Sequence, residues 1–135
     1  MNIWIYDNIL QGAKEYNSKN KLYNNQVVGV APLEPKYPLT VIDEVRNVAT
    51  RSYNTPYDKT TSNGYRVDVF AQDKGKKSKQ EIAREIAQSI NTYLCDYVGL
   101  HQVSYNVMPS VNDNSLYHIT MMYEGTLHIN RAKFI

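Results

Sequence analysis

The fold of this chain is decided by residues 65–99, which read "YRVDVFAQDKGKKSKQEIAREIAQSINTYLCDYVG". The first eight of these residues alternate, with Val67, Val69 and Ala71 on one side of an extended chain. The other side carries Arg66, Asp68, Phe70 and Gln72. Because successive side chains of a strand point to opposite faces, this pattern predicts a β-strand over residues 65–72 with one buried face.

A basic turn and a long amphipathic helix follow this strand. The turn, residues 73–77, contains Gly75. Ser78 and Glu81 then form a capping box, in which the serine oxygen accepts a backbone N–H of the first helical turn. Apolar residues recur at helical spacing after the cap, at Ile82, Ile86, Ile90 and the pair Tyr93 and Leu94. Gly99 is a favoured residue just past a helix end, so the sequence predicts a helix of about twenty residues, some 30 Å long.

The N-terminal segment predicts another helix and an edge strand. Residues 3–16 carry an apolar stripe made of Ile5, Ile9, Ala13 and Tyr16. We expect the Asn-rich residues 17–26 to end this helix and form a loop. Residues 27–31 are apolar but are bounded by Pro32 and Pro35, which predicts a sheet edge or a crossover.

The middle of the chain predicts two strands and a polar connection. Residues 39–43 and 45–53 are rich in β-branched residues and are predicted as strands. Residues 54–64 are polar, and they end in Asn63 and Gly64, a strong turn dipeptide. This connection is longer than a tight hairpin needs, which makes it a candidate working surface.

The last third returns to strands. Apolar residues alternate at Val103, Tyr105 and Val107, and a turn is predicted at residues 112–114. Residues 116–129 then alternate with Tyr117, Ile119, Met121, Tyr123, Leu127 and Ile129 on one face. Gly125 interrupts this run and predicts a bulge or bend. The fold class is therefore α+β: a mixed, mainly antiparallel β-sheet of about five strands packed by two helices, in the order α-β-β-β-α-β-β, as a single domain over residues 1–135.

Composition narrows the function classes. Hydrophobic residues make up 42% of the 135 residues and charged residues 21%, which is typical of a globular domain with its own core. The net charge of +2 gives no whole-molecule argument for a nucleic acid or an acidic membrane. Cys95 stands alone in a helical pattern, so we expect a buried, inert thiol and folding in a reducing, intracellular setting. The first ten residues lack a basic region and no apolar run reaches membrane-spanning length, so neither a signal peptide nor a membrane span is expected.

Tyrosine is over-represented, with twelve Tyr against two Phe and one Trp. Such rings are enriched where protein surfaces meet. Five of them are spread over several predicted elements: Tyr53, Tyr57, Tyr65, Tyr117 and Tyr123. Either these rings serve an interface between subunits, or they are core and rim residues of a monomer.

The sequence contains no complete motif for catalysis or cofactor binding. The turn before the long helix lies where a phosphate-binding loop would lie, but Phe70 occupies the position of a required Gly and Lys77 that of the Ser or Thr. The lysines of this turn lack interleaved aromatic residues for stacking on a nucleic acid. Asp43 and Glu44 are adjacent and point to opposite faces of a strand, so they cannot act together. Asp68 fits a solvated or ion-paired strand residue better than a general base, and we expect no enzyme and no cofactor.

A metal site is not expected either. His118 and His128 lie ten residues apart on one strand face, about 33 Å along an extended strand. His101 has no Cys or carboxylate at ligand spacing. These three histidines are expected at the surface or in an interface.

The segment "GYRVDVFAQDKGKKSKQEIAREIAQSINTYL", residues 64–94, resembles the tail terminator proteins of long-tailed bacteriophages, also called tail completion or head–tail joining proteins. In that family a strand similar to residues 66–71 runs into a long helix, and a closing strand similar to residues 117–129 completes the sheet. The resemblance in element order covers most of the chain, and its sequence-specific part is about thirty residues.

The resemblance implies a ring-shaped homo-oligomer, a hexamer, that caps the tail tube and stops its polymerisation. Its partners would be other copies of itself, the major tail tube protein and a head-completion or connector protein. DNA would only pass through the channel, and no membrane is involved. The chain would reside at the tail–neck junction of the virion after assembly in the bacterial host cytoplasm.

By analogy with the family, the polar connection contacts the tube, and the basic turn is added as a second candidate. The candidate partner-binding residues are Tyr53, Asn54, Thr55, Pro56, Tyr57, Asp58, Lys59, Asn63, Gly64, Lys74, Lys76 and Lys77. The alternatives are another phage neck or tail-assembly protein, such as a head-closure or tail-tube-like subunit, or a small ligand- or nucleic-acid-binding regulator.

Overall fold

The computed structural model describes residues 6–20, 22–50, 60–108, 116–128 and 133–134. The two helices are α1 (Tyr6–Asn20) and α2 (Lys79–Thr92), and α2 continues into a π-helical turn, η1 (Tyr93–Val98). The strands are β1 (Gln26–Val28), β2 (Leu39–Thr50), β3 (Thr60–Ala71), β4 (His101–Met108), β5 (Tyr117–His128) and β6 (Lys133–Phe134). This order confirms the predicted α-β-β-β-α-β-β arrangement, to which the two-residue β6 is added.

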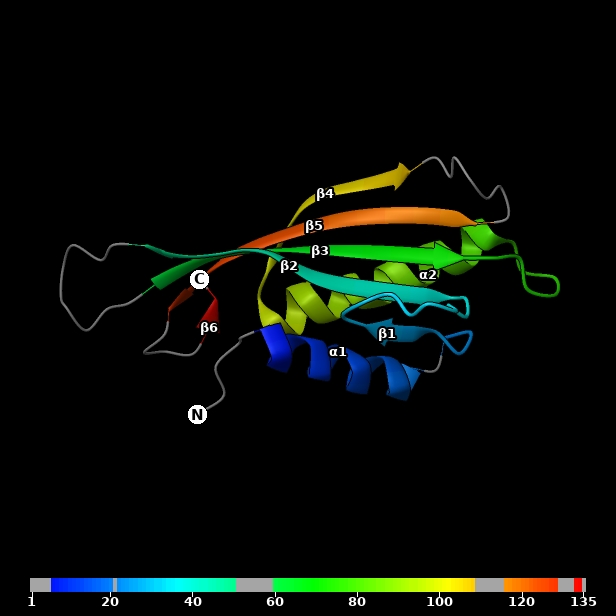
Figure 1. The fold of residues 1–135 in the computed structure, drawn as a ribbon, viewed down its shortest axis with the longest axis horizontal. Coiled ribbons are helices and arrows are strands. Elements are labelled where there is room, and N and C mark those ends of the chain that lie inside the picture. Colours follow the sequence, from blue (N-terminus) through cyan, green and yellow to red (C-terminus); the bar gives the residue numbers. More distant parts are fainter. Residues whose placement is uncertain (1–5, 21, 51–59, 109–115, 129–132, 135) are drawn as a thin grey trace.

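The strands form one mixed sheet in the order β1-β2-β3-β5-β4, with β6 attached to β5 (Figure 1). β1 pairs with β2 in parallel, and all other pairs are antiparallel. The prediction that the apolar run bounded by prolines lies at an edge is confirmed, since β1 is an end strand. β4 is the opposite end strand.

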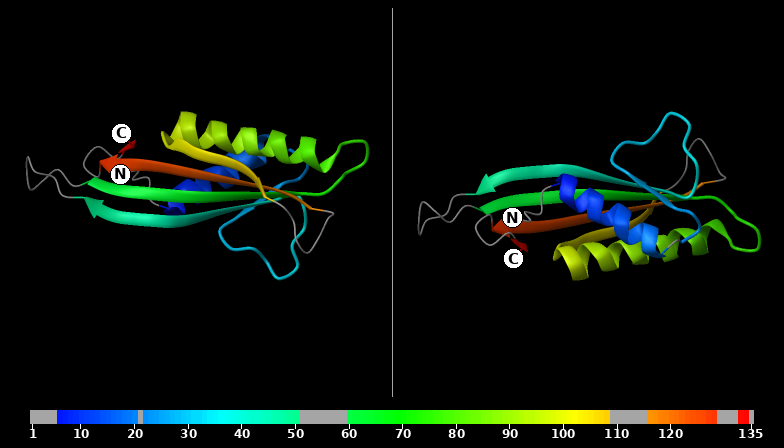
Figure 2. Two further views of the ribbon diagram at one scale, coloured as in Figure 1. Left: turned by 90° about the horizontal axis from the view of Figure 1, so that it is seen from above. Right: turned by 90° about the horizontal axis from the view of Figure 1, so that it is seen from below.

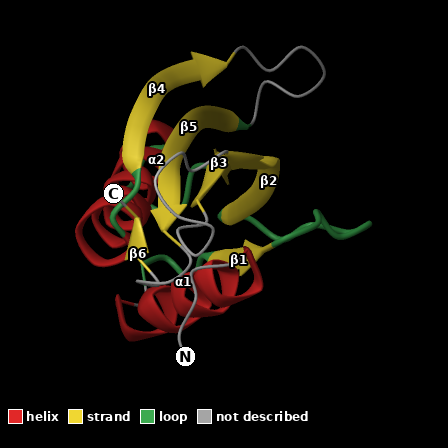
Figure 3. Ribbon diagram, turned by 90° about the vertical axis from the view of Figure 1, so that its left-hand side faces the viewer, coloured by secondary structure: helices red, strands yellow, loops and turns green. Residues whose placement is uncertain are grey.

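Both helices cover the same face of the sheet, and the sheet curls around them (Figures 2 and 3). Val67 and Val69 of β3, Ile86 of α2 and Ile9 of α1 are among the fully buried residues of one core cluster. The helices are joined where the Tyr93 hydroxyl donates to the backbone oxygen of Ile9 at 3.1 Å. A side chain at Gly12 would have to displace this contact, because its Cβ would lie 2.1 Å from the Tyr93 hydroxyl.

The segment that decides the fold behaves as its pattern predicts. The Ser78 side chain accepts the backbone N–H of Glu81 at 3.3 Å, which confirms the cap of α2. The apolar stripe of the helix is buried, at Ile82, Ile86, Ile90, Tyr93 and Leu94. The helix ends at Gly99, whose φ of 94° lies in the left-handed region and whose N–H donates to the Leu94 oxygen at 3.1 Å.

Two predicted boundaries are wrong, both at asparagines. α1 continues past Tyr16 to Asn20, where the Asn20 side chain donates to the Tyr16 backbone oxygen at 2.7 Å. Asn63 and Gly64 do not form a turn but lie inside β3, opposite β2 on one side and β5 on the other. The Asn63 side chain is buried and donates to the Thr61 hydroxyl at 2.9 Å, so a local side-chain bond satisfies it within a strand.

The irregularities of the sheet also differ from expectation. The two strands predicted over residues 39–53 form, over the described residues 39–50, one strand, β2, with a register shift between Glu44 and Arg46. Pairing runs without a shift through Gly125, which lies opposite Asn63, so the predicted bulge there is wrong. A shift occurs instead in β4, between Gln102 and Ser104. The predicted turn at residues 112–114 and the strand end at Ile129 lie outside the described residues.

Candidate functional site

The end strand β4 exposes the apolar residues that its alternating pattern contains. Val103, Tyr105 and Val107 are 57%, 44% and 50% exposed, and Met108 is 43% exposed. Among the described strands β4 pairs only with β5, so one edge of β4 faces away from the sheet. An unpaired edge with apolar side chains is a template for pairing with another chain. This edge is the first part of the candidate site.

A groove lies between α2 and β4, on the helix-covered side of the sheet. Its volume is about 340 Å³. The lining combines apolar groups with polar groups on α2 and β4, and consists of Arg84, Ala87, Gln88, Asn91, Gln102, Tyr105 and Met121. Ala87 and Met121 are buried in the core, whereas Arg84 is exposed. The groove is therefore an apolar hollow with a cation at its rim.

One end of the groove is fixed by a chain of hydrogen bonds. The Gln102 side chain donates to the Tyr123 hydroxyl at 3.2 Å, and that hydroxyl donates to the Asn91 side-chain oxygen at 2.7 Å. Burial raises the pKa of Tyr105, and the nearby positive charge of Arg84 counteracts part of this rise. The wall of the groove is thus held in place by the chain's own contacts.

The connection between β1 and β2, residues 29–38, is a second unusual surface. It projects from the side of the sheet opposite to α2 (Figure 2). Leu33 is 103% exposed and Val30 is 83% exposed, more than any other large hydrophobic residues described. Glu34 beside them is also exposed. The sequence does contain a signal for this surface, an apolar residue between Pro32 and Pro35, but no partner contact was predicted from it.

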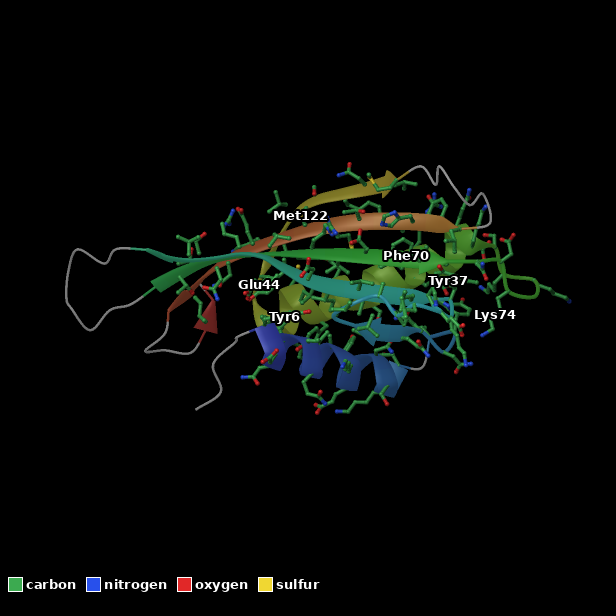
Figure 4. All side chains as sticks on the ribbon, viewed as in Figure 1. Tyr6, Tyr37, Glu44, Phe70, Lys74 and Met122 are labelled. Carbon is green, nitrogen blue, oxygen red and sulfur yellow. The ribbon has the colours of Figure 1, made fainter. Side chains whose placement is uncertain are left out.

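The face of the sheet that the helices leave open carries a polar cluster centred on β3. The Asp68 carboxylate accepts from Thr120 at 2.8 Å and from Arg66 at 3.0 Å, and its Oδ1 lies 2.8 Å from His118 Nε2. The His118 ring stacks on Phe70 with centroids 4.2 Å apart (Phe70 is labelled in Figure 4). Asp68 is only 7% exposed.

The electrostatics of this cluster fit a structural role. Burial would raise the pKa of Asp68, but hydrogen bonds from His118 and Thr120 and the charge of Arg66 outweigh it, so the pKa is lowered. A carboxylate with these partners holds its proton poorly and is already engaged by its own chain. The expectation of an ion-paired strand residue is confirmed by the Arg66 contact.

The predicted partner-binding residues fall into three groups. Tyr53, Asn54, Thr55, Pro56, Tyr57, Asp58 and Lys59 lie outside the described residues. Asn63 and Gly64 are strand residues near the beginning of β3, and the basic turn follows the end of β3. A twelve-residue strand separates these ends by about 36 Å at 3.3 Å per residue, so the structure does not bring the two groups together.

The basic turn is tied to its surroundings. Lys74 and Lys77 exchange backbone hydrogen bonds of 3.0 and 3.1 Å, and the Lys74 side chain donates to the Tyr23 backbone oxygen at 3.3 Å (Lys74 is labelled in Figure 4). Lys77 Nζ lies 3.7 Å from a Glu81 oxygen. Lys76 is exposed.

The start of α2 is likewise occupied by the chain itself. The Asp73 carboxylate accepts the Lys79 backbone N–H at 2.7 Å, and the Ser78 hydroxyl accepts the Glu81 N–H at 3.3 Å. Two of the N–H groups at the start of α2, which would be available to an anion at a free helix N-terminus, are therefore used by side chains of the chain itself.

Three of the five tyrosines considered for an interface are described, and all three lie in the core or pack against it: Tyr65, Tyr117 and Tyr123. Tyr65 and Tyr123 are buried in the core, so for these two the monomer-core alternative is correct. Tyr53 and Tyr57 lie outside the described residues. The exposed rings are instead Tyr105 on β4 and Tyr97 on η1, which is 64% exposed.

Other classes of site find little support in the described part of the chain. No three or more His, Cys, Asp or Glu side chains gather there as metal ligands would. No described helix is long and apolar enough to cross a membrane. Cys95 is half-buried rather than fully buried, and burial raises its pKa, which disfavours the reactive thiolate.

Comparison with known proteins gives a match in structure and none in sequence. No protein-family model matches the chain, and no curated protein matches it. A chain in a solved structure described as "Virion of native gene transfer agent (GTA) particle" has a similar fold, with a TM-score of 0.59. The similarity covers 89% of this chain and 91% of that chain at 11% sequence identity. At this identity the likeness concerns the fold alone.

Proposed function

We propose that this chain is a structural subunit of a phage-like virion that forms a ring on the end of the tail tube. Two likenesses support the proposal: residues 64–94 resemble tail terminator proteins, and the whole fold is similar to a chain of a gene transfer agent virion. In this role residues 1–135 act as one non-enzymatic domain. The ring stops tube polymerisation, joins the tail to a head-completion protein and lets DNA pass through its channel.

The observation that carries the proposal is the β4 edge. Four apolar side chains on one end strand are 43–57% exposed, although the same chain buries Ile82, Ile86 and Ile90 of α2 to 1% exposure or less. Exposed apolar patches of this kind mark protein–protein contacts. A subunit that must meet other copies needs such a surface, whereas a monomeric regulator does not.

The contact with the tube is proposed at the far end of the β2–β3 pair. These strands stay paired out to Thr50 and Thr60, beyond both helices (Figure 1). Val48 on this extension is 54% exposed. We assign the tube contact to residues 53–59, together with the paired strand ends that carry them.

Electron microscopy of the chain added to tail tubes of its own particle tests the function. We expect rings seated on tube ends, and tubes that no longer elongate when tube protein is supplied. Absence of any association with tubes would contradict the proposal. Rings attached to the head connector but never to tubes would assign the chain to head closure instead.

A deletion tests the contact with the tube. Removing residues 56–59 leaves β3 intact, since β3 begins at Thr60. We expect this variant to keep its near-ultraviolet circular dichroism and its self-association but to lose tube binding. Tube binding at the wild-type level would exclude these residues as the contact.

A further inference from the structure

We propose that residues 29–38 of one copy dock into the groove between α2 and β4 of the next copy, with Leu33 as the inserted side chain. This inference rests on the proposed function, which requires self-association, and it names the two surfaces that meet. Each copy would contribute its loop to one neighbour and its groove to the other.

The loop has the properties of an inserted segment. Leu33 is fully exposed and Val30 nearly so, and neither is covered by the chain that carries them. Pro32 and Pro35 flank Leu33 and restrict the backbone on both sides, which lowers the entropy lost on docking. The loop therefore presents a large apolar side chain on a stiffened support.

The groove has the size and lining to receive that side chain. Its volume of about 340 Å³ is at the lower end of the range for specific pockets. Apolar atoms of Ala87, Tyr105 and Met121 line it. A leucine side chain would cover part of the exposed Tyr105 ring while leaving the hydrogen-bonded end at Gln102 undisturbed.

Charge complementarity favours the same pairing of loop and groove. Glu34 follows Leu33 and is exposed on the loop, and Arg84 is exposed at the rim of the groove. When Leu33 enters the groove, its neighbour Glu34 comes within reach of the Arg84 guanidinium. An arginine–carboxylate contact at the rim of an apolar insertion favours the correct register of the two copies.

The positions of the two surfaces favour a ring over a two-fold dimer. The loop precedes β2 at the β1 side of the sheet, and the groove adjoins β4, the opposite end strand. The loop also projects from the side opposite to α2 (Figure 2). A two-fold dimer would have to make both loop–groove contacts within one pair of copies, which the placement at opposite sides of the sheet disfavours. Repeated head-to-tail contacts use one loop and one groove per neighbour, and they close into a ring when the rotation between neighbours is suitable.

Disulfide trapping tests the docking directly. In a Cys95→Ala background, Ala31→Cys, which keeps Leu33 in place, is combined with Gln88→Cys on α2 or with Gln102→Cys on β4, so that both sides of the groove are sampled. Under thiol-exchange conditions at high protein concentration, and again with rings on tubes, we expect linked dimers and a ladder of larger species with at least one pair. The matched control combines Ala31→Cys with Gln11→Cys, which is exposed on α1.

The outcomes separate this inference from the proposed function. Linked species from a groove pair but not from the control support the docking. Equal linking of all pairs, or none in solution and none in rings seated on tubes, overturns it. Rings on tubes without the groove link would overturn the docking while the proposed function stands, and groove links in a chain that never binds tubes would do the reverse.

A charge-reversal cycle gives a second measurement. We expect Glu34→Arg and Arg84→Glu each to slow formation of the groove link about tenfold, and the double variant to restore most of the rate. Both residues are exposed, so the fold should tolerate the changes, which circular dichroism verifies. Additive losses in the double variant would show that the two charges do not meet.

Discussion

Helix α2 and the edge strand β4 each carry an apolar face, but the rest of the chain covers only the apolar face of α2. Ile82, Ile86 and Ile90 recur at helical spacing and are at most 1% exposed, because β3 and β5 lie beneath them. Val103, Tyr105 and Val107 recur at strand spacing and remain 44–57% exposed. Periodicity therefore identifies an apolar face, but the rest of the fold decides whether that face is core or surface.

This difference separates stability from assembly in one chain. Each fully buried aliphatic side chain of α2 contributes about 1.5–3 kcal/mol to folding. The apolar groups of β4 contribute little while they stay in water, and their burial is available to a partner. We expect changes on α2 to unfold the chain, and changes on β4 to leave it folded but unable to assemble.

The largest effect is expected for Ile86→Asp. Ile86 is 1% exposed within the core cluster, and an unpaired carboxylate there is costly enough to unfold the chain. Near-ultraviolet circular dichroism and chemical denaturation measure the loss. A variant that keeps a native spectrum and a cooperative transition would remove the face of α2 from the core and break the comparison.

A smaller effect is expected on the open face of the sheet, where polar partners rather than a helix shield Asp68. Asp68→Asn removes the charge that Arg66, His118 and Thr120 engage, and should cost about 2 kcal/mol at neutral pH, as for a hydrogen bond to a charged group.

The pH dependence of that cost has a defined sign. The folded pKa of Asp68 lies below its ordinary value of 3.8, so the stabilisation is present above pH 3.8 and is lost as the pH falls through the lower folded value. The difference in unfolding free energy between wild type and variant should therefore shrink below pH 3.8. A difference that is the same at pH 7 and at strongly acidic pH would contradict the charge-based account.

A third variant, Ser78→Ala, measures how far α2 depends on its own local signal. The Ser78 side chain accepts the Glu81 N–H, and loss of such a cap costs about 1 kcal/mol. The Asp73 carboxylate still accepts the neighbouring Lys79 N–H, so the helix should remain formed. Denaturation should give a lower midpoint with an unchanged slope; Ser78→Asp, which can still cap, is the control.

Local patterns predicted most of the fold because packing agreed with them. The cap at Ser78, the stripe of α2 and the alternation of β3 are all satisfied by neighbouring elements. The prediction of a turn at Asn63 was wrong because an asparagine can form its side-chain hydrogen bonds within a strand. The Asn63 amide donates to the Thr61 hydroxyl. An Asn-Gly dipeptide does not force a turn when the strand that contains it stays paired with its neighbours.

The candidate site was harder to predict, because its apolar residues are exposed only where the fold leaves them uncovered. The pattern of Val103, Tyr105 and Val107 is that of a half-buried strand, and no sequence feature indicates that α2 stops short of covering it. The groove joins α2 to β4 across elements that only the fold brings together. Leu33 between two prolines was visible in the sequence, but its exposure follows from the path of the loop.

The smallest effect on stability is expected for Val107→Glu, and it sharpens the comparison most. Val107 is 50% exposed on β4, so the substitution should change the free energy of unfolding by no more than about 0.5 kcal/mol. The same charge on the apolar edge should abolish assembly, because a desolvated carboxylate at a subunit contact finds no partner among Val103 and Tyr105. Denaturation measures the first quantity and ring formation on tail tubes the second, with Val107→Thr as the shape-matched control that keeps β-branching. If Val107→Glu destabilised the chain as strongly as Ile86→Asp, β4 would belong to the core after all; if it assembled normally, the exposed edge would serve no contact between copies.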